Sequence, residues 1–96
     1  MKMIFLSYKE SLDDLVMQKV ESFGIRSFTK WKEVQDRGDS GYPKMGTHIW
    51  PGFNSALVFL AEDDIAVSLF EAVREYNKET TFEIIKGFSW TIDDVC

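Results

Sequence analysis

One long irregular stretch, Arg37 to Asn54 (RGDSGYPKMGTHIWPGFN), divides the chain into two halves that follow a similar plan. The stretch holds four of the six glycines, both prolines and the only histidine, and neither a helical nor a strand period runs through it. Long irregular segments are uncommon in compact domains, where they are usually functional or disordered. Ile49, Trp50 and Phe53 make this one too apolar to be wholly solvated. We therefore predict a long loop between two strands, kept for contact with a ligand or another chain.

The half before the loop is predicted to form a strand, a helix and a second strand. Met1–Tyr8 is a short apolar run that fits a buried strand. Ser11, with Asp14 three residues later, resembles a capping box at the start of a helix with one apolar face. Gly24 is expected to end that helix in a left-handed conformation. The strand-favouring side chains of Ile25–Gln35 predict the second strand, with one charged face.

The half after the loop repeats this order. Ser55–Ala61 (SALVFLA) is a continuous apolar run, which predicts a central strand covered on both sides. Asp63 or Asp64 is expected to cap a second helix that ends between Asn77 and Glu79. Thr80–Ile85 alternates as a fourth strand would, and Gly87 is expected to break it. The tail GFSWTIDDVC is predicted to be a further short strand or a docked extension.

This order predicts one domain, residues 1–96, of the α+β class: a ferredoxin-like βαββαβ sandwich with a long loop between strands 2 and 3. Both helices would pack on one face of an antiparallel sheet, so the other face must be polar or covered. Aromatic residues make up 15% of the chain, and interfaces are enriched in them. Another copy of the chain is therefore the predicted cover, with Trp31 and Trp90 expected in the interface.

Composition narrows the classes of function. The net charge of −5 argues against general binding to nucleic acid or to anionic membranes, which needs clustered Lys and Arg. No stretch approaches the ~20 apolar residues of a membrane span, and no signal peptide is visible. The single cysteine, Cys96, cannot form an internal disulfide. We expect a cytoplasmic protein without membrane insertion.

The chain resembles the PII-like signal-transduction superfamily in its order of elements and in the place of its long loop. The matching features are GIRSFTKWKEVQDRG before the loop and NSALVFLAEDD after it. The resemblance implies a ferredoxin-like subunit, usually in a homo-oligomer of three copies (a trimer). It also implies small ligands, often adenine nucleotides, in clefts between subunits. We further predict a partner protein that contacts the 37–54 loop.

The sequence departs from the classical nitrogen-regulatory members at their phosphate loop. Those members have a loop rich in glycine and lysine between the second helix and the fourth strand, whereas this chain has NKETTFE, without glycine and with Glu79 and Glu83. Close approach of phosphate to the backbone favours glycine and opposes acidic side chains. Lys86 and Gly87 remain as the possible remnant of a phosphate contact.

Candidate ligand-binding residues lie mainly in the loop. Basic side chains and glycines there could hold an anion, or could simply form a solvated loop tip. Trp50 could stack on a base or fill a cleft between subunits, although packing within the fold is favoured. The predicted ligand-binding residues are Arg37, Gly38, Lys44, Gly46, Thr47, Trp50, Lys86 and Gly87.

His48 is the candidate metal ligand, because imidazole binds transition metals and small trimeric proteins of the cation-tolerance type are similar in size. Met45, Asp36, Asp39 and Cys96 are possible partners without a recognised spacing, and a structural histidine is the more common alternative.

Catalysis is not expected, since there is no Ser–His–Asp arrangement and no metal motif. Three hypotheses follow. The first is a trimeric regulatory protein that binds a small molecule and signals through residues 37–54. The others are a transition-metal-binding protein that uses His48 and a purely structural interaction module. The sequence identifies no cofactor.

Overall fold

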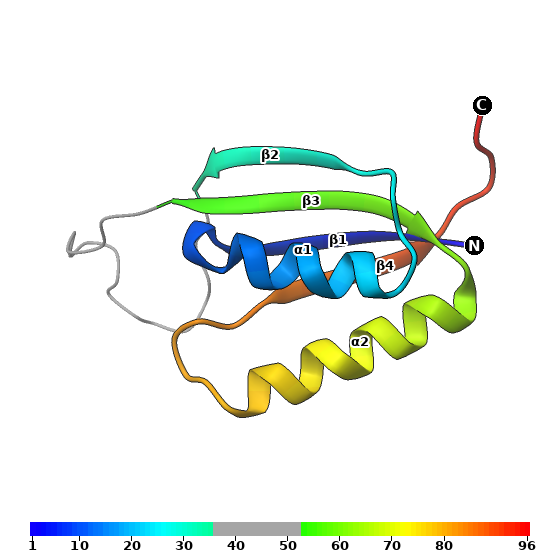
Figure 1. The fold of residues 1–96 in the computed structure, drawn as a ribbon. Helices are drawn as coiled ribbons and strands as arrows, with labels where there is room; N and C mark the ends of the chain where they lie inside the picture. Colours follow the sequence, from blue (N-terminus) through cyan, green and yellow to red (C-terminus); the bar gives the residue numbers. More distant parts are fainter. Residues whose placement is uncertain (36–52) are drawn as a thin grey trace.

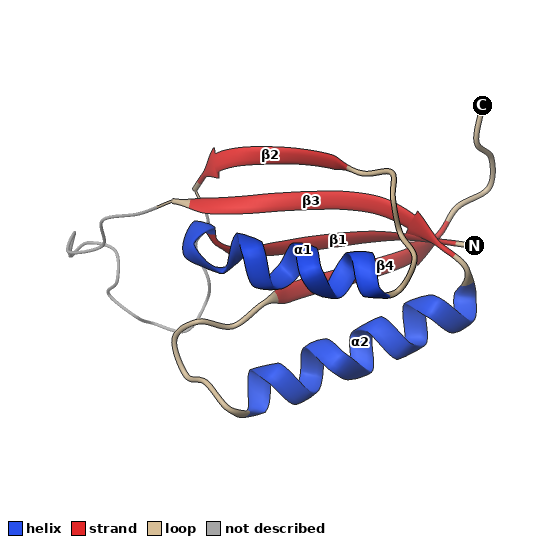
Figure 2. Ribbon diagram, in the orientation of Figure 1, coloured by secondary structure: helices blue, strands red, loops and turns tan. Residues whose placement is uncertain are grey.

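The computed structural model describes residues 1–35 and 53–96, in which two helices cover one face of a four-stranded antiparallel sheet (Figures 1 and 2). This arrangement confirms the predicted ferredoxin-like fold class. The strands are β1 (Lys2–Lys9), β2 (Thr29–Val34), β3 (Asn54–Ala61) and β4 (Lys86–Thr91), and the helices are α1 (Asp13–Ser22), α2 (Asp63–Lys78) and a short 3-10 helix, η1 (Glu10–Leu12).

The strands lie in the order β2-β3-β1-β4, so β3 and β1 are central and β2 and β4 form the edges. In the register, Ile4 lies opposite Phe59, and Leu6 lies opposite Leu57. Because side chains alternate across a strand, this register separates a helix-facing set from a set on the other side. We call the side without helices the open face.

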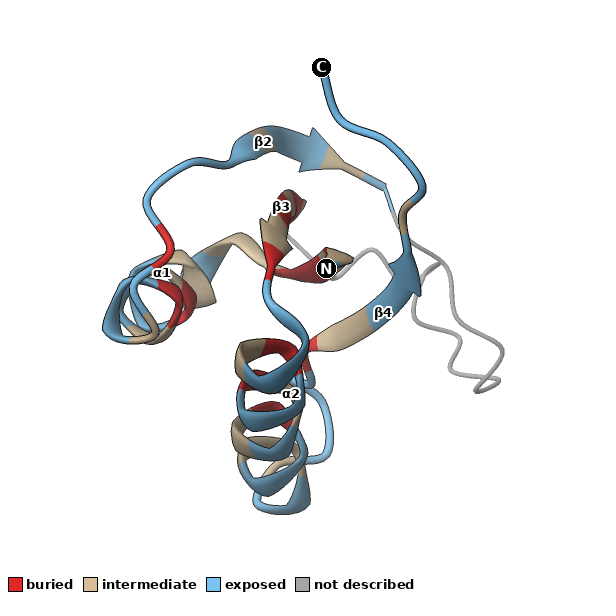
Figure 3. Cartoon of the chain, turned by 90° about the vertical axis from the view of Figure 1, so that its right-hand side faces the viewer, coloured by how far each residue is buried: buried red, intermediate tan, exposed pale blue. Residues whose placement is uncertain are grey.

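The core lies between the sheet and the helices (Figure 3). Ile4 and Leu57 of the sheet are fully buried, and Val20 of α1 and Leu69 of α2 pack on the same layer. The apolar face predicted for each helix is therefore the face that packs on the sheet. Within this single chain, β3 is covered by helices on one side only, so cover on its other side stays a prediction that depends on another chain. Val58 and Leu60, on its open face, are half-buried.

The start of α1 differs from the prediction. Ser11 lies in η1, the N-cap residue is Leu12, and no side chain makes a capping hydrogen bond there. The predicted capping box was wrong because a 3-10 turn precedes the helix and places Ser11 too early. The helix end was predicted correctly: Gly24 has φ +83° and donates a backbone hydrogen bond to Glu21 at 2.9 Å.

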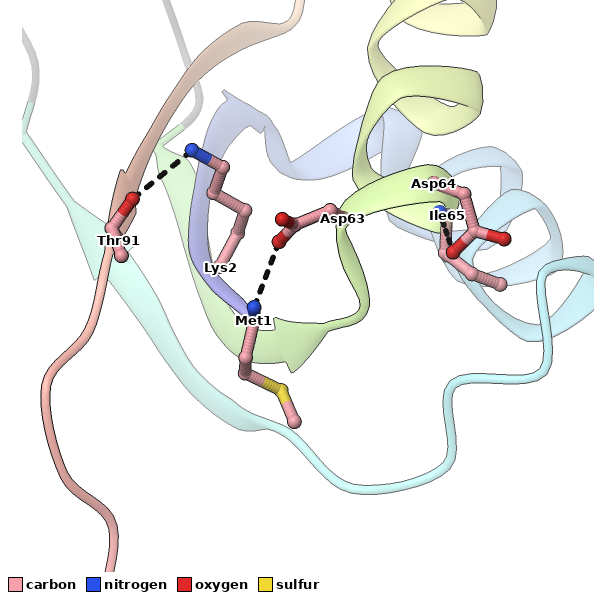
Figure 4. A network of polar contacts seen from close by, with 6 residues as sticks. All are labelled: Met1, Lys2, Asp63, Asp64, Ile65 and Thr91. Carbon is pink, nitrogen blue, oxygen red and sulfur yellow. Dashed lines mark hydrogen bonds and ion pairs between the residues drawn. The ribbon is translucent and has the colours of Figure 1, made fainter.

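The start of α2 also lacks the predicted aspartate cap. Glu62 is the N-cap residue and makes no side-chain capping bond. Asp63 instead accepts a 2.8 Å hydrogen bond from the amino group of Met1, and Asp64 accepts one from the backbone N–H of Ile65 (Figure 4). Both acids still lie in the first turn, where negative charge suits the helix dipole.

The fourth strand lies later in the chain than predicted. Residues 80–85 form a connection in which Phe82 is 65% exposed, and β4 begins at Lys86. The side-chain amide of Asn77 donates to the carbonyl of Ile85 and accepts from its N–H, each at 2.8 Å. The backbone N–H and carbonyl of Ile85 are therefore hydrogen-bonded to a side chain and not to a neighbouring strand. Gly87, predicted to break a strand, lies inside β4.

Within the described part of the chain, no helix has the length and apolar character needed to cross a membrane.

Candidate functional site

The open face of the sheet is apolar and aromatic. The register places Phe5 beside Phe88 and Met3 beside Trp90, all on the side without helices. The rings of Phe5 and Phe88 lie 6.0 Å apart between centroids. Trp31, Phe88 and Trp90 keep about half of their surface exposed, at 50%, 53% and 49%. Large contiguous apolar patches are uncommon on monomers and mark sites of association.

A β-bulge in β2 shapes one end of this face. Trp31 pairs with Ala56, but Val34 pairs with Asn54, so an extra residue of β2 is accommodated between these two pairs. Glu33, in the bulge, has φ +60°, a conformation that residues other than glycine rarely adopt. By simple alternation Trp31 and Val34 would point to opposite sides of the sheet. The bulge brings both to the open face.

This rearrangement forms a hollow of about 460 Å³, which we call the loop-side hollow. It lies at the end of the sheet where β2 ends and β3 begins, which is the end where residues 36–52 join the described fold. Lys86 is the only charged side chain among the described residues that line it. The lining residues are Phe5, Ser7, Trp31, Val34, Gln35, Ala56, Lys86 and Phe88.

The chemistry of this hollow suits a small anion with a flat apolar part. The indole of Trp31 and the ring of Phe88 offer surfaces for stacking. The ammonium group of Lys86 can neutralise an anionic group, and the Ser7 hydroxyl and Gln35 amide can donate or accept hydrogen bonds. Of the described residues predicted from the sequence, Lys86 is therefore in the hollow.

Gly87, the other described residue of the predicted set, does not line this hollow. It pairs with Leu6 on the helix side of the sheet, where a Cβ atom would lie 3.1 Å from the Leu6 side chain and 3.2 Å from the ring of Phe70. The absent Cβ lets α2 pack closely on β4, and ligand binding by Gly87 stays a prediction. Arg37, Gly38, Lys44, Gly46, Thr47, His48 and Trp50 lie outside the described residues.

Because Phe70 lies against Gly87, a larger residue there should loosen the packing of α2 on the sheet. We expect Gly87→Val to lower the free energy of unfolding by about 1–3 kcal/mol, the usual effect of overpacking. Chemical denaturation followed by circular dichroism would measure it, with Ser89→Val in the same strand as a matched β-branched control. Equal stability of Gly87→Val and the unaltered protein would contradict this packing role.

A polar cluster that no sequence pattern indicates ties three elements together on the helix side. The hydroxyl of Tyr8 in β1 donates to Asp13 at 2.7 Å, and the ammonium of Lys30 in β2 donates to the same carboxylate at 2.9 Å. Tyr8 is 1% exposed. The sequence neighbours of Asp13 carry no signal for a pair formed with a residue 17 positions away.

Burial and charge set the ionisation of this cluster. Burial raises the pKa of Tyr8, and the neighbouring Asp13 carboxylate raises it further. Burial also acts to raise the pKa of Asp13, but the hydrogen bonds from Lys30 and Tyr8 and the nearby positive charges outweigh it and lower that pKa below its usual value. At neutral pH the cluster is therefore a neutral phenol and an ammonium group on one carboxylate.

Metal ligation finds no support in the described part of the chain, where no group of three or more His, Cys, Asp or Glu side chains could hold an ion. His48 and its possible partners Met45, Asp36 and Asp39 all lie outside that part. The metal hypothesis stays a prediction.

No protein-family model matches the sequence, and a search among curated proteins finds no match. Solved structures do match the fold. A PII-like signalling protein from Thermus thermophilus superposes with a TM-score of 0.68 at 15% identity, over 93% of this chain and 82% of that one.

The CPII protein of Thiomonas intermedia, a nitrogen regulatory PII-like protein, matches in several states. Its complex with ADP and bicarbonate gives a TM-score of 0.68 at 9% identity, over 95% of this chain and 86% of that one. Its complex with ADP, AMP and acetate gives a TM-score of 0.70 at 6% identity, over 97% of this chain and 88% of that one. The chain thus has the ferredoxin-like fold of PII-like proteins, which confirms the fold implied by the resemblance seen in the sequence.

Proposed function

We propose that this chain is a PII-like regulatory protein that assembles as a homotrimer and binds a small anionic ligand, a nucleotide by preference, in the loop-side hollow. The observation that carries the proposal is the position of Lys86 among aromatic side chains, on the open face and at the end of the sheet where residues 36–52 join the described fold. The fold shared with PII-like signalling proteins supports it.

Assembly is supported by the open face. Three aromatic residues on one side of a small sheet, each about half exposed, leave a large apolar area in water. Among the described residues that line the loop-side hollow, Lys86 is the only charged one, so this part of the open face carries no negative charge that would oppose association. Three copies could bury these faces against one another, and each loop-side hollow would then lie next to a neighbouring subunit.

A nucleotide is favoured because it combines the two chemical groups that the hollow suits. A base can stack on Trp31 or Phe88, and a phosphate can pair with Lys86. CPII was solved with ADP and AMP, which makes adenine nucleotides the first ligands to test. The connection at 79–85 has Glu79 and Glu83 and no glycine, so phosphate contacts would come from Lys86 and from the predicted Arg37 and Lys44.

Regulation, not catalysis, is the proposed role. Filling the hollow would change the order of the 37–54 segment, and a partner protein would bind one of the two forms. The hypothesis of a purely structural module differs in one respect: it predicts that no small ligand stabilises the fold.

A thermal-shift panel of ADP, AMP, ATP, bicarbonate and divalent metal ions tests the proposal, because a ligand that prefers the folded state raises the melting temperature. We expect adenine nucleotides to raise it and Lys86→Ala to weaken their binding about tenfold or more, the effect of losing one charge-assisted contact. Calorimetric titration would measure the affinity.

Lys78→Ala is the matched control, since Lys78 is exposed on α2 and pairs with Glu75. Equal affinities of the Lys86→Ala and unaltered proteins would reject the loop-side hollow as the site. Stabilisation by Zn, Co, Ni or Cu ions that is lost in His48→Ala would instead favour the metal hypothesis.

A further inference from the structure

A second hollow, of about 680 Å³, lies at the opposite end of the sheet from the loop-side hollow, and we call it the far-end hollow. It forms where the chain leaves α1 and has not yet begun to pair as β2. Its lining is mostly apolar, and it draws side chains from both faces of the sheet, among them Leu60 from the open face and Phe23 and Ile65 from the helix side.

Part of an inner strand is uncovered at this hollow. The pairing of β2 with β3 begins at Thr29 opposite Val58, so Phe59, Leu60 and Ala61 pair with β1 on one side only. Phe28, next to this stretch, is 42% exposed. An extended segment with apolar side chains could lie against this edge, as in β-strand addition.

The C-terminal segment, residues 92–96 (IDDVC), is an extended segment of this kind. It follows β4 at the same end of the sheet, since Thr91 pairs with Lys2 and Lys2 pairs with Ala61 (Figure 4). It projects from the sheet (Figures 1 and 3), and Val95 is 59% exposed. Its sequence combines two apolar residues with two acids.

We propose that residues 92–96 of one copy dock in the far-end hollow of a neighbouring copy, as a short strand beside β3. The apolar lining would receive Ile92 or Val95, and Asp93 and Asp94 would lie near Arg26, the only basic side chain among the described lining residues. Glu62 also lines the hollow, so the acids must approach from the side of Arg26.

Sheet topology favours a neighbouring copy over the same chain. The segment continues from β4, whereas the uncovered side of β3 faces β2, at the other edge of the sheet. To reach it, the segment would have to cross the open face over β1 and β3, which the proposed assembly covers. A neighbour can approach the β2 edge directly. This inference therefore rests on the homo-oligomer in the proposed function.

Disulfide trapping tests the docking, because Cys96 is the only cysteine of the chain and is exposed. A second thiol is introduced by Ser27→Cys in the lining of the far-end hollow. Mild oxidation is expected to join Cys96 of one copy to this thiol in another and to give covalent dimers and larger species. Ser68→Cys, on the exposed side of α2, is the control for random collision.

Adding Asp93→Asn, Asp94→Asn and Val95→Ser to Ser27→Cys should lower the cross-linked yield about threefold to tenfold, as the charge and apolar contacts are lost. Yields equal to those of Ser68→Cys, or an intrachain disulfide alone, would overturn the proposal. Light scattering on the same samples separates the two ideas: a trimer without specific cross-links rejects the docking only, and a monomer rejects the assembly as well.

Discussion

A Phe88→Asp variant is expected to be monomeric at micromolar concentrations at which the unaltered protein is an oligomer. Phe88 lies on the open face in the edge strand β4, 53% exposed and beside Phe5, and it lines the loop-side hollow. An aspartate at this position would be buried in the interface without a partner, which costs several kcal/mol for each unpaired ion. Light scattering or sedimentation would measure the change in mass.

The substitution should leave the fold of the single chain intact, because the Phe88 side chain does not contribute to the core under the helices. Circular dichroism checks this. Val67→Asp is the matched control, since Val67 is 59% exposed on the outer side of α2, away from the sheet. A Phe88→Asp protein with the mass of the unaltered oligomer would show that the open face is not the interface.

An Asp13→Ala variant is expected to lose about 2–4 kcal/mol of the free energy of unfolding, since buried hydrogen-bonded charges left without their partner are strongly destabilising. The substitution removes the acceptor of both Tyr8 and Lys30, whose side chains are largely buried. For a domain of this size the melting temperature should fall by about 10 °C or more. Asp14→Ala, at the next and exposed position of the same helix turn, is the control.

The pH dependence of stability should also show the contribution of the cluster of Tyr8, Asp13 and Lys30. The folded state lowers the pKa of Asp13, so the stabilisation it gives is present above the ordinary aspartate pKa and is lost as the pH falls through the lowered value. The folded state raises the pKa of Tyr8, so stability should also fall as the pH rises above about 10, where tyrosine ionises in the unfolded chain.

The acid part of this dependence should be smaller in Asp13→Asn and the alkaline part smaller in Tyr8→Phe, as measured by denaturation across pH. An acid limb that is unchanged in Asp13→Asn would show that other carboxylates dominate. The cluster also matters for the site, because Lys30 lies in β2, close to the bulge that forms the loop-side hollow.

Short-range patterns predicted most of the elements. The apolar runs at Met1–Tyr8 and Ser55–Ala61 became β1 and β3, and the helices predicted after each of these runs became α1 and α2. Gly24 has the left-handed conformation expected of it. These signals are strong because a buried face must repeat with the period of its element, and a chain reversal with positive φ favours glycine.

The errors arose where a local pattern competed with a distant contact. Thr80–Ile85 alternates like a strand, but Asn77 holds the backbone of Ile85, and the strand that pairs with β1 begins one residue later. Gly87 was expected to break a strand, but it lies inside β4, where its missing side chain leaves room for Phe70. Both outcomes depend on which groups the folded chain brings together, and this cannot be inferred from the residues nearby in the sequence.

The sequence by itself determined the α+β plan, the two apolar-faced helices and the position of the irregular segment, because periodicity and backbone preference are properties of neighbouring residues. Only the tertiary structure decided that Lys86 joins Trp31 and Phe88 in one hollow, that the Glu33 bulge turns Val34 to the open face, and that Asp13 holds Tyr8 and Lys30. Each of these depends on strand register and on contacts between residues far apart in the chain. Both are fixed only when the strands pair and the helices pack on the sheet.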